Sequence, residues 1–190
     1  MATKTKSVTV KTNGVDVDAL YATIDLIKEN PDLGQFRFQQ TNQWLNCGHN
    51  RSTIQNFYGA GADQTRPSPF VLDADEPPLL LGEDTGANPV EYLLHALTAC
   101  VTTSIVYHAA ARGIRIDEIE SQTEGDIDLR GFLGIDENVH NGFQNIRISF
   151  KIKADVPDEK LDELCQMGAS FSPVKDTVSR AVNVEVGLHN

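Results

Sequence analysis

Cys100 is the residue of this chain whose setting points most clearly to chemistry. It lies in a long apolar run that begins Asn88-Pro-Val-Glu and continues through Ala99-Cys100. A thiolate can attack one oxygen of a peroxide, which leaves a sulfenic acid on sulfur and releases an alcohol. Free cysteine is also among the residue types most often buried as inert packing. The run therefore predicts either a protected redox centre or a core thiol.

The elements around Cys100 can be predicted from local rules. Asn88 suits the N-cap of a helix, Pro89 its first position, and Glu91 the carboxylate of a capping box. The apolar pattern continues to Ala111, and Arg112-Gly113 supplies a C-terminal stop. The sequence thus predicts a helix over 89–111. Because apolar residues occur on nearly all of its sides, we expect this helix to be buried all round.

Cys100 cannot rely on the dipole of this helix for activation. It lies about 17 Å from the helix start, at about 1.5 Å per residue, whereas the dipole acts mainly within the first turn. Apolar burial raises the pKa of a thiol. A nearby cation must therefore stabilise the thiolate if Cys100 is to react at neutral pH.

The Asn-Pro-x-Glu and Ala-Cys pattern resembles the OsmC/Ohr-like superfamily, the osmotically induced and organic hydroperoxide resistance proteins. Ser170-Phe-Ser-Pro-Val174 stands where that family often has Cys-Pro-Val, and Val182–Gly187 resembles its closing strand. The likeness extends over residues 36–188. It implies an α+β fold with antiparallel sheets around a long buried central helix, assembled as an intertwined homodimer.

The resemblance also implies site residues. Cys100 would be the peroxidatic nucleophile, and an arginine from the N-terminal strands, held by a glutamate at the helix start, would stabilise its thiolate. Arg51 is the first candidate for that arginine, with Arg37 and Arg66 as alternatives. Glu91 is the candidate glutamate, although the peroxidase branch has it one position earlier, where this chain has Val90.

The family's resolving cysteine corresponds to Ser172, which cannot form a disulfide. Cys165 lies about two turns earlier and could resolve only if its helix turned it toward Cys100. We therefore expect a one-cysteine, peroxiredoxin-type mechanism with an external thiol reductant, an organic hydroperoxide as substrate, and no metal or organic cofactor. Ser172 and Val90 keep an alternative open, in which the dimer is non-catalytic and binds an apolar or thiol-bearing small molecule.

Bulk properties exclude several classes of partner. The 190 residues carry a net charge of −11, which argues against nucleic acid or an anionic membrane. The start Met-Ala-Thr-Lys lacks an apolar core, and the three cysteines, Cys47, Cys100 and Cys165, have neither disulfide nor metal spacing. We expect a cytoplasmic protein, with no membrane-spanning segment.

The order of predicted elements is α+β. We expect an N-terminal extension over residues 1–35, with a strand at 7–11 and a helix at 16–29 through which a partner could act, and an OsmC-like domain over 36–190. The remaining predictions are strands at 36–45, 52–58, 69–73, within 114–129, and at 146–153 and 182–187, a loop at 131–142, and helices at 158–170 and 174–181.

Overall fold

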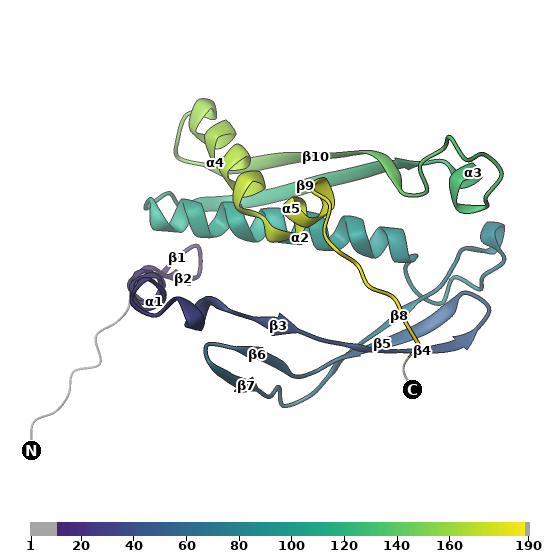
Figure 1. Ribbon diagram of the computed structural model, residues 1–190. Helices are drawn as coiled ribbons and strands as arrows, with labels where there is room; N and C mark the ends of the chain where they lie inside the picture. The colour runs from purple at the N-terminus through teal and green to yellow at the C-terminus, as the bar shows by residue number, and fades with distance from the viewer. Residues whose placement is uncertain (1–10, 189–190) are drawn as a thin grey trace, which may run out of the picture. The chain divides into compact units, whose positions relative to one another are not determined.

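The chain divides into two compact units, which are described separately. A computed structural model of the protein describes residues 11–188 (Figure 1). Residues 16–93 form one unit, here called the strand unit. Residues 11–15 and 94–188 belong to the other, here called the helical unit. Helix α2, Pro89–Ala111, begins in the strand unit and continues through the helical unit.

The strand unit contains two small antiparallel sheets. One has the order β3-β6-β7 and the other β4-β5-β8. Helix α1 precedes them and begins at Asp16, whose side chain accepts a hydrogen bond from the amide of Ala19 at 2.9 Å. The elements are α1 Val17–Glu29, η1 Pro31–Gly34, β3 Arg37–Phe38, β4 Thr41–Asn46, β5 His49–Ile54, β6 Phe57–Gly59, β7 Ala62–Gln64, β8 Phe70–Ala74 and η2 Pro78–Leu80.

The helical unit is built on one long antiparallel hairpin. Its elements are β9 Ile116–Ile127, α3 Leu129–Phe132, β10 Phe143–Ala154, α4 Asp158–Phe171 and α5 Pro173–Ser179. Short strands β1 Lys11–Thr12 and β2 Val15–Asp16 form a separate two-stranded sheet. Between them, Asn13 donates to the carbonyl of Ile114 and accepts from the amide of Ile116, both at 2.9 Å.

Alternation along β9 and β10 gives the hairpin an apolar face and a charged face. Ile119 lies opposite Ile152, and both pack against the core of the unit. On the other face the acids of β9 lie opposite the bases of β10. These pairs are Glu118 with Lys153, Glu120 with Lys151, and Glu124 with Arg147. The period of two thus turns only one face of the hairpin toward the helices.

The core of the helical unit is a stripe on α2. Leu97, Val101, Ile105 and Ala109 recur every four residues and are at most 4% exposed. Leu164 of α4 completes this buried cluster. The two helices approach closely at Gly168, where an added Cβ would lie 2.3 Å from Cγ1 of Ile105.

The predicted bounds of α2 are confirmed at both ends, but its predicted burial on all sides is wrong for the single chain. Leu93 is 38% and Tyr107 48% exposed, because the hairpin and α4 pack only against the stripe. Within residues 11–188, α2 is also the helix long and apolar enough to cross a membrane by length and composition. Core helices of soluble proteins pass the same test.

Most of the other predicted elements are confirmed. The helices expected at 16–29, 158–170 and 174–181 appear as α1, α4 and α5. The hairpin β9–β10 carries α3, which begins at Leu129 and extends only into the first two residues of the loop predicted at 131–142. The predicted last strand is absent from the described part of the chain. Residues 182–187 are in no strand, and Val186 is 94% exposed. Of the predicted strand at 7–11, only Lys11 lies among the described residues.

Candidate functional site

The start of α2 is fixed by a capping box, as predicted. The amide of Asn88 donates to Oε2 of Glu91, and Oδ1 of Asn88 accepts from the amide of Val90, both at 2.9 Å. The side-chain amide of Asn88 also bonds the carboxylate of Glu76. The Glu91 carboxylate therefore serves the backbone at the helix start, and Val90 contributes only its amide.

Cys100 is a free, partly buried thiol in the part of α2 that belongs to the helical unit. Leu97, three positions before Cys100, and Val101, one position after it, are buried in the core stripe. Ala96 and Thr103 are exposed. The helix thus anchors Cys100 through its neighbours and leaves the thiol at the border between core and surface. A thiol in this setting combines a fixed position with access for a small molecule.

The other two cysteines are placed differently. Cys165 packs against the core of the helical unit, and burial, with a smaller effect of Asp162, raises the pKa of its thiol. Cys165 is therefore a poor source of thiolate at neutral pH. Cys47 is exposed in the β4–β5 turn, where its backbone φ is 47° and its thiol donates to the carbonyl of Leu81 at 3.0 Å.

Arg51 lies on β5 directly opposite Asp73 of β8. Its Nε donates to Oδ1 of Asp73 at 2.8 Å, and its NH2 donates to Oδ2 at 3.1 Å. Nε2 of His49 lies 3.0 Å from the same Oδ1. Hydrogen bonds from Arg51 and His49 hold the pKa of Asp73 below its usual value, and Asp73 in turn raises the pKa of Arg51. In this cluster, Arg51 is bound by a carboxylate that is ionised at neutral pH.

The two alternative arginines have aromatic partners in the strand unit. The guanidinium of Arg66 lies 4.8 Å from the ring centroid of Phe57 and 5.5 Å from that of Phe70. Its NH1 also donates to the carbonyl of Gln55 at 2.7 Å. Arg37 lies 5.9 Å from the centroid of Tyr58. Of the three arginines, Arg51 alone forms an ion pair among the described residues.

Asp75 organises the loop that leads into α2. It is 1% exposed, and its carboxylate accepts from the amides of Glu76, Glu83 and Thr85 and from the hydroxyl of Thr85 at 2.8 to 3.2 Å. Burial alone would raise its pKa, but these bonds outweigh burial and lower the pKa to about 2. Sequence reasoning missed this residue, since its partners lie up to ten positions away.

We expect Asp75 to make the protein sensitive to acid. Because its pKa is lower in the folded than in the unfolded chain, its contribution to stability is full above pH about 4 and is lost as the pH falls toward about 2. Asp75→Asn should therefore melt at a lower temperature than the wild type at pH 7. The difference in melting temperature should shrink below pH 4 and vanish near pH 2.

Thermal melts followed by circular dichroism from pH 7 to pH 2 would measure this. The matched control is Asp63→Asn, which alters an exposed carboxylate on β7. A melting difference for Asp75→Asn that stayed constant across the whole range would contradict the assigned role.

Ser172 is buried at the junction of α4 and α5, where it is 1% exposed. Its hydroxyl oxygen accepts from the amide of Lys175 at 3.1 Å, so it is the N-cap of α5, with Pro173 at the first helical position. The residue expected at the resolving position thus has a structural role here. A serine before proline is a local signal that could have predicted this cap.

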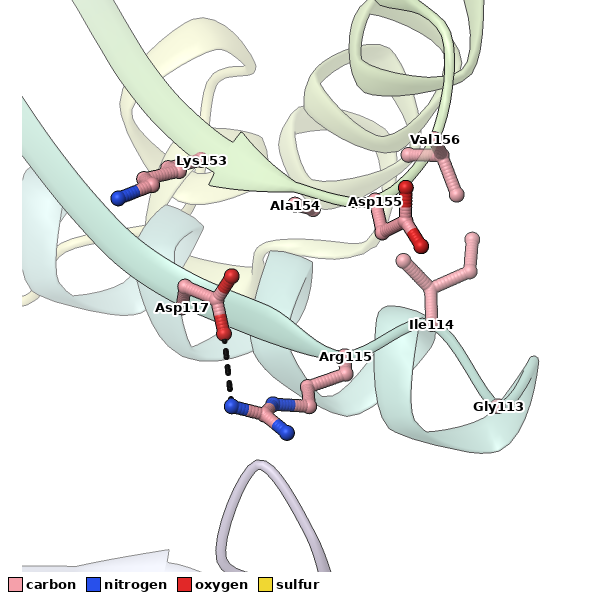
Figure 2. Close-up of a pocket in the computed structure, with 8 residues that line it drawn as sticks. All are labelled: Gly113, Ile114, Arg115, Asp117, Lys153, Ala154, Asp155 and Val156. Atoms are coloured by element: carbon pink, nitrogen blue, oxygen red, sulfur yellow. Dashed lines mark ion pairs between the residues drawn. The ribbon is translucent and has the colours of Figure 1, made fainter.

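The helical unit also has an open hollow of about 700 Å³ at the end of the hairpin (Figure 2). Arg115 and Asp117 pair across 3.0 Å beside it, and Lys153 and Asp155 add one charge of each sign. None of the predicted site residues lines it. Residues 11–188 also contain no group of three or more His, Cys, Asp or Glu side chains that could hold a metal ion.

Asp73 is the other functional candidate that sequence reasoning missed. The pattern predicted the strand of Asp73 but not which residue of β5 it would face, because register depends on pairing. The structure places Arg51 and Glu91 in the strand unit and Cys100 in the helical unit. Arg51 is bound by Asp73 and Glu91 by the helix cap.

Comparisons with known proteins agree with the fold. A family model described as "OsmC-like protein" matches residues 82–187, which include Cys100 and Ser172 but not Arg51. No curated protein matches the chain. Several solved structures align with it. An OsmC-like protein from Mycoplasma pneumoniae has a TM-score of 0.56 at 17% identity, over 75% of this chain and 86% of the other.

An organic hydroperoxide resistance protein OsmC from Legionella pneumophila has a TM-score of 0.53 at 14% identity, over 75% and 90% of the two chains. An OsmC-like protein of unknown function from Vibrio cholerae has a TM-score of 0.50 at 10% identity, over 75% and 94%. At these identities the structures share a fold with this chain.

Proposed function

This chain belongs to the OsmC-like protein family, and on that premise we propose that it reduces organic hydroperoxides in oxidative stress defence, with Cys100 as a single peroxidatic cysteine. The observation that carries the proposal is the free, partly buried thiol on the helix that the family match covers. The hydroperoxide resistance named for the Legionella pneumophila protein of the same fold supports it.

In the proposed reaction, the Cys100 thiolate attacks the distal oxygen of the hydroperoxide and breaks the O–O bond. The alkoxide takes a proton and leaves as an alcohol, and Cys100 becomes a sulfenic acid. An external thiol then displaces water to form a mixed disulfide, and a second thiol releases Cys100 as thiolate. Two thiols are thus oxidised to a disulfide for each hydroperoxide reduced to alcohol and water.

We propose that Arg51 stabilises the thiolate of Cys100. Glu91 is proposed to hold the start of α2, the helix that carries Cys100. An external reductant is part of the proposal because the Ser172 oxygen cannot form a disulfide and the pKa of Cys165 is raised. The apolar residues of α2 favour bulky hydroperoxides over hydrogen peroxide, because burial of an apolar tail is favourable.

We also propose a cytoplasmic homodimer. Apolar side chains exposed on the single chain support it, among them Tyr107 at 48% and Val184 at 75%. Residues 182–188 alternate apolar and polar side chains and have no strand partner among residues 11–188, as a segment that pairs with a second chain would. Light scattering after size exclusion should give twice the 20.8 kDa of one chain.

The first test of the enzyme is the intact mass of the reduced protein after one equivalent of cumene hydroperoxide, with a sulfenic-acid trap present. One adduct, located on Cys100, is expected to form faster than with hydrogen peroxide. Cys100→Ser should give no adduct, while Cys47→Ser, which removes an exposed thiol, should behave as the wild type.

A non-catalytic binding protein remains the second candidate function, and the burial of Ser172 as a helix cap favours it. In that case an apolar or thiol-bearing small molecule would be the ligand. No adduct at Cys100, together with alkylation of this thiol only after unfolding, would refute the peroxidase and support the binding protein.

A further inference from the structure

We propose that Asp73, rather than Glu91, is the positioning residue that holds Arg51 in the orientation its chemistry requires. This inference rests on the proposed function, in which Arg51 stabilises the Cys100 thiolate. The candidate glutamate is already engaged, because Oε2 of Glu91 accepts the amide of Asn88 at 2.9 Å. The carboxylate that binds Arg51 comes from the neighbouring strand instead.

The pairing of Arg51 with Asp73 fixes the plane of the guanidinium. Two hydrogen bonds, Nε to Oδ1 at 2.8 Å and NH2 to Oδ2 at 3.1 Å, form a bidentate pair. Within residues 11–188, NH1 of Arg51 has no hydrogen-bond partner. The bidentate pair therefore leaves one side of the cation available for an anion, such as a thiolate or a developing alkoxide.

Asp73 is itself held from three sides. Nε2 of His49 lies 3.0 Å from Oδ1 of Asp73, the same oxygen that accepts from Nε of Arg51. The hydroxyl of Tyr92 donates to the backbone carbonyl of Asp73 at 2.7 Å. The backbone at Gly86 packs so closely that an added Cβ would lie 2.2 Å from the same carbonyl oxygen.

One of these contacts connects Asp73 to the first turns of α2 within the strand unit. Tyr92 lies in the first turns of α2, and its bond ties the β8 strand at Asp73 to the start of that helix. The low pKa of Asp73 keeps its carboxylate ionised throughout the neutral range, so it serves as a fixed acceptor and takes up no proton in the reaction. Its role is to orient and hold the cation.

The test is the rate at which Cys100 is alkylated in the folded full chain between pH 5 and 9. Peptide-resolved mass spectrometry measures this rate. Arg51→Ala is expected to slow the alkylation of Cys100 about tenfold at pH 7, with little effect at pH 9. Asp73→Asn should slow alkylation by a similar factor and slow trapping with cumene hydroperoxide at least tenfold. The double variant should equal Arg51→Ala, because both changes remove one interaction.

Two further variants keep the result interpretable. Asp128→Asn breaks a comparable bidentate pair with Arg130 in the helical unit, with NH2 to Oδ2 at 2.6 Å, and should leave the alkylation rate of Cys100 unchanged. Tyr92→Phe removes the hydrogen bond to the Asp73 carbonyl without changing any charge and should slow the alkylation of Cys100 by a smaller factor. It serves as the test if Asp73→Asn does not fold by circular dichroism.

Failure of this inference differs from failure of the proposed function. If Arg51→Ala slows the alkylation of Cys100 while Asp73→Asn leaves its rate unchanged or raises it, Asp73 does not position Arg51 and the inference is overturned alone. If Arg51→Ala has no effect, the inference is overturned together with the role of Arg51. If Cys100 forms no sulfenic acid in the wild type, the peroxidase itself is refuted.

Discussion

Replacement of Arg51 by alanine is expected to slow the reaction of Cys100 with cumene hydroperoxide by about 100-fold, the usual effect of losing one preorganised electrostatic contact to a reacting anion. The loss should be larger at pH 6 than at pH 9. The cation is proposed to favour the thiolate, so its loss should matter least at high pH, where the thiolate forms in either protein. Stopped-flow measurement of sulfenic-acid formation across this range would give both quantities.

Arg66→Ala and Arg37→Ala are the matched controls, since both arginines were alternatives by sequence and both lie in the strand unit. Their guanidinium groups lie over aromatic rings, so their removal should change the rate less than threefold. A 100-fold loss in Arg66→Ala combined with a normal rate in Arg51→Ala would assign the thiolate-stabilising role to Arg66.

Ile105→Ala is expected to destabilise the folded chain by about 2–5 kcal/mol, the range for large-to-small changes in a packed core. Ile105 is fully buried at the centre of the α2 stripe and contacts α4 at Gly168. Chemical denaturation would measure the loss, with Thr103→Ala, on the exposed side of the same helix, as the control.

Gly168 makes this prediction more specific. Gly168→Ala alone should destabilise the protein by about 1–3 kcal/mol, because the new methyl group would overlap Ile105. In the double variant, Ile105→Ala removes the atoms that the new methyl group would overlap. The double variant should therefore lose less stability than the sum of the losses of the two single variants. Strict additivity would show that the two helices do not share this contact.

Local signals explain what the sequence could predict. The bounds of α2 follow from Asn88-Pro at its start and Arg112-Gly113 at its end, and both are confirmed to the residue. The hairpin β9–β10 follows from apolar and polar alternation on both strands. These features depend on residues a few positions apart, for which capping and periodicity rules are sufficient.

The partners of the candidate site depend on contacts that such rules do not reach. Arg51 and Asp73 are 22 residues apart and meet because of one strand register. A shift of one residue would turn Asp73 to the other face of the sheet. The prediction that α2 is buried on all sides was wrong for a related reason. The sequence of a helix shows which of its faces are apolar, but not which other elements pack against those faces.

The oxygen of Ser172 determines how easily this position could hold a thiol. Ser172→Cys would place sulfur there, but sulfur is a weak acceptor for the amide of Lys175. Loss of the N-cap would destabilise the protein by about 1 kcal/mol, before any strain from a larger atom in a fully buried place. A single change to cysteine at this position is therefore costly, and a thiol at the junction of α4 and α5 would first require another cap for α5.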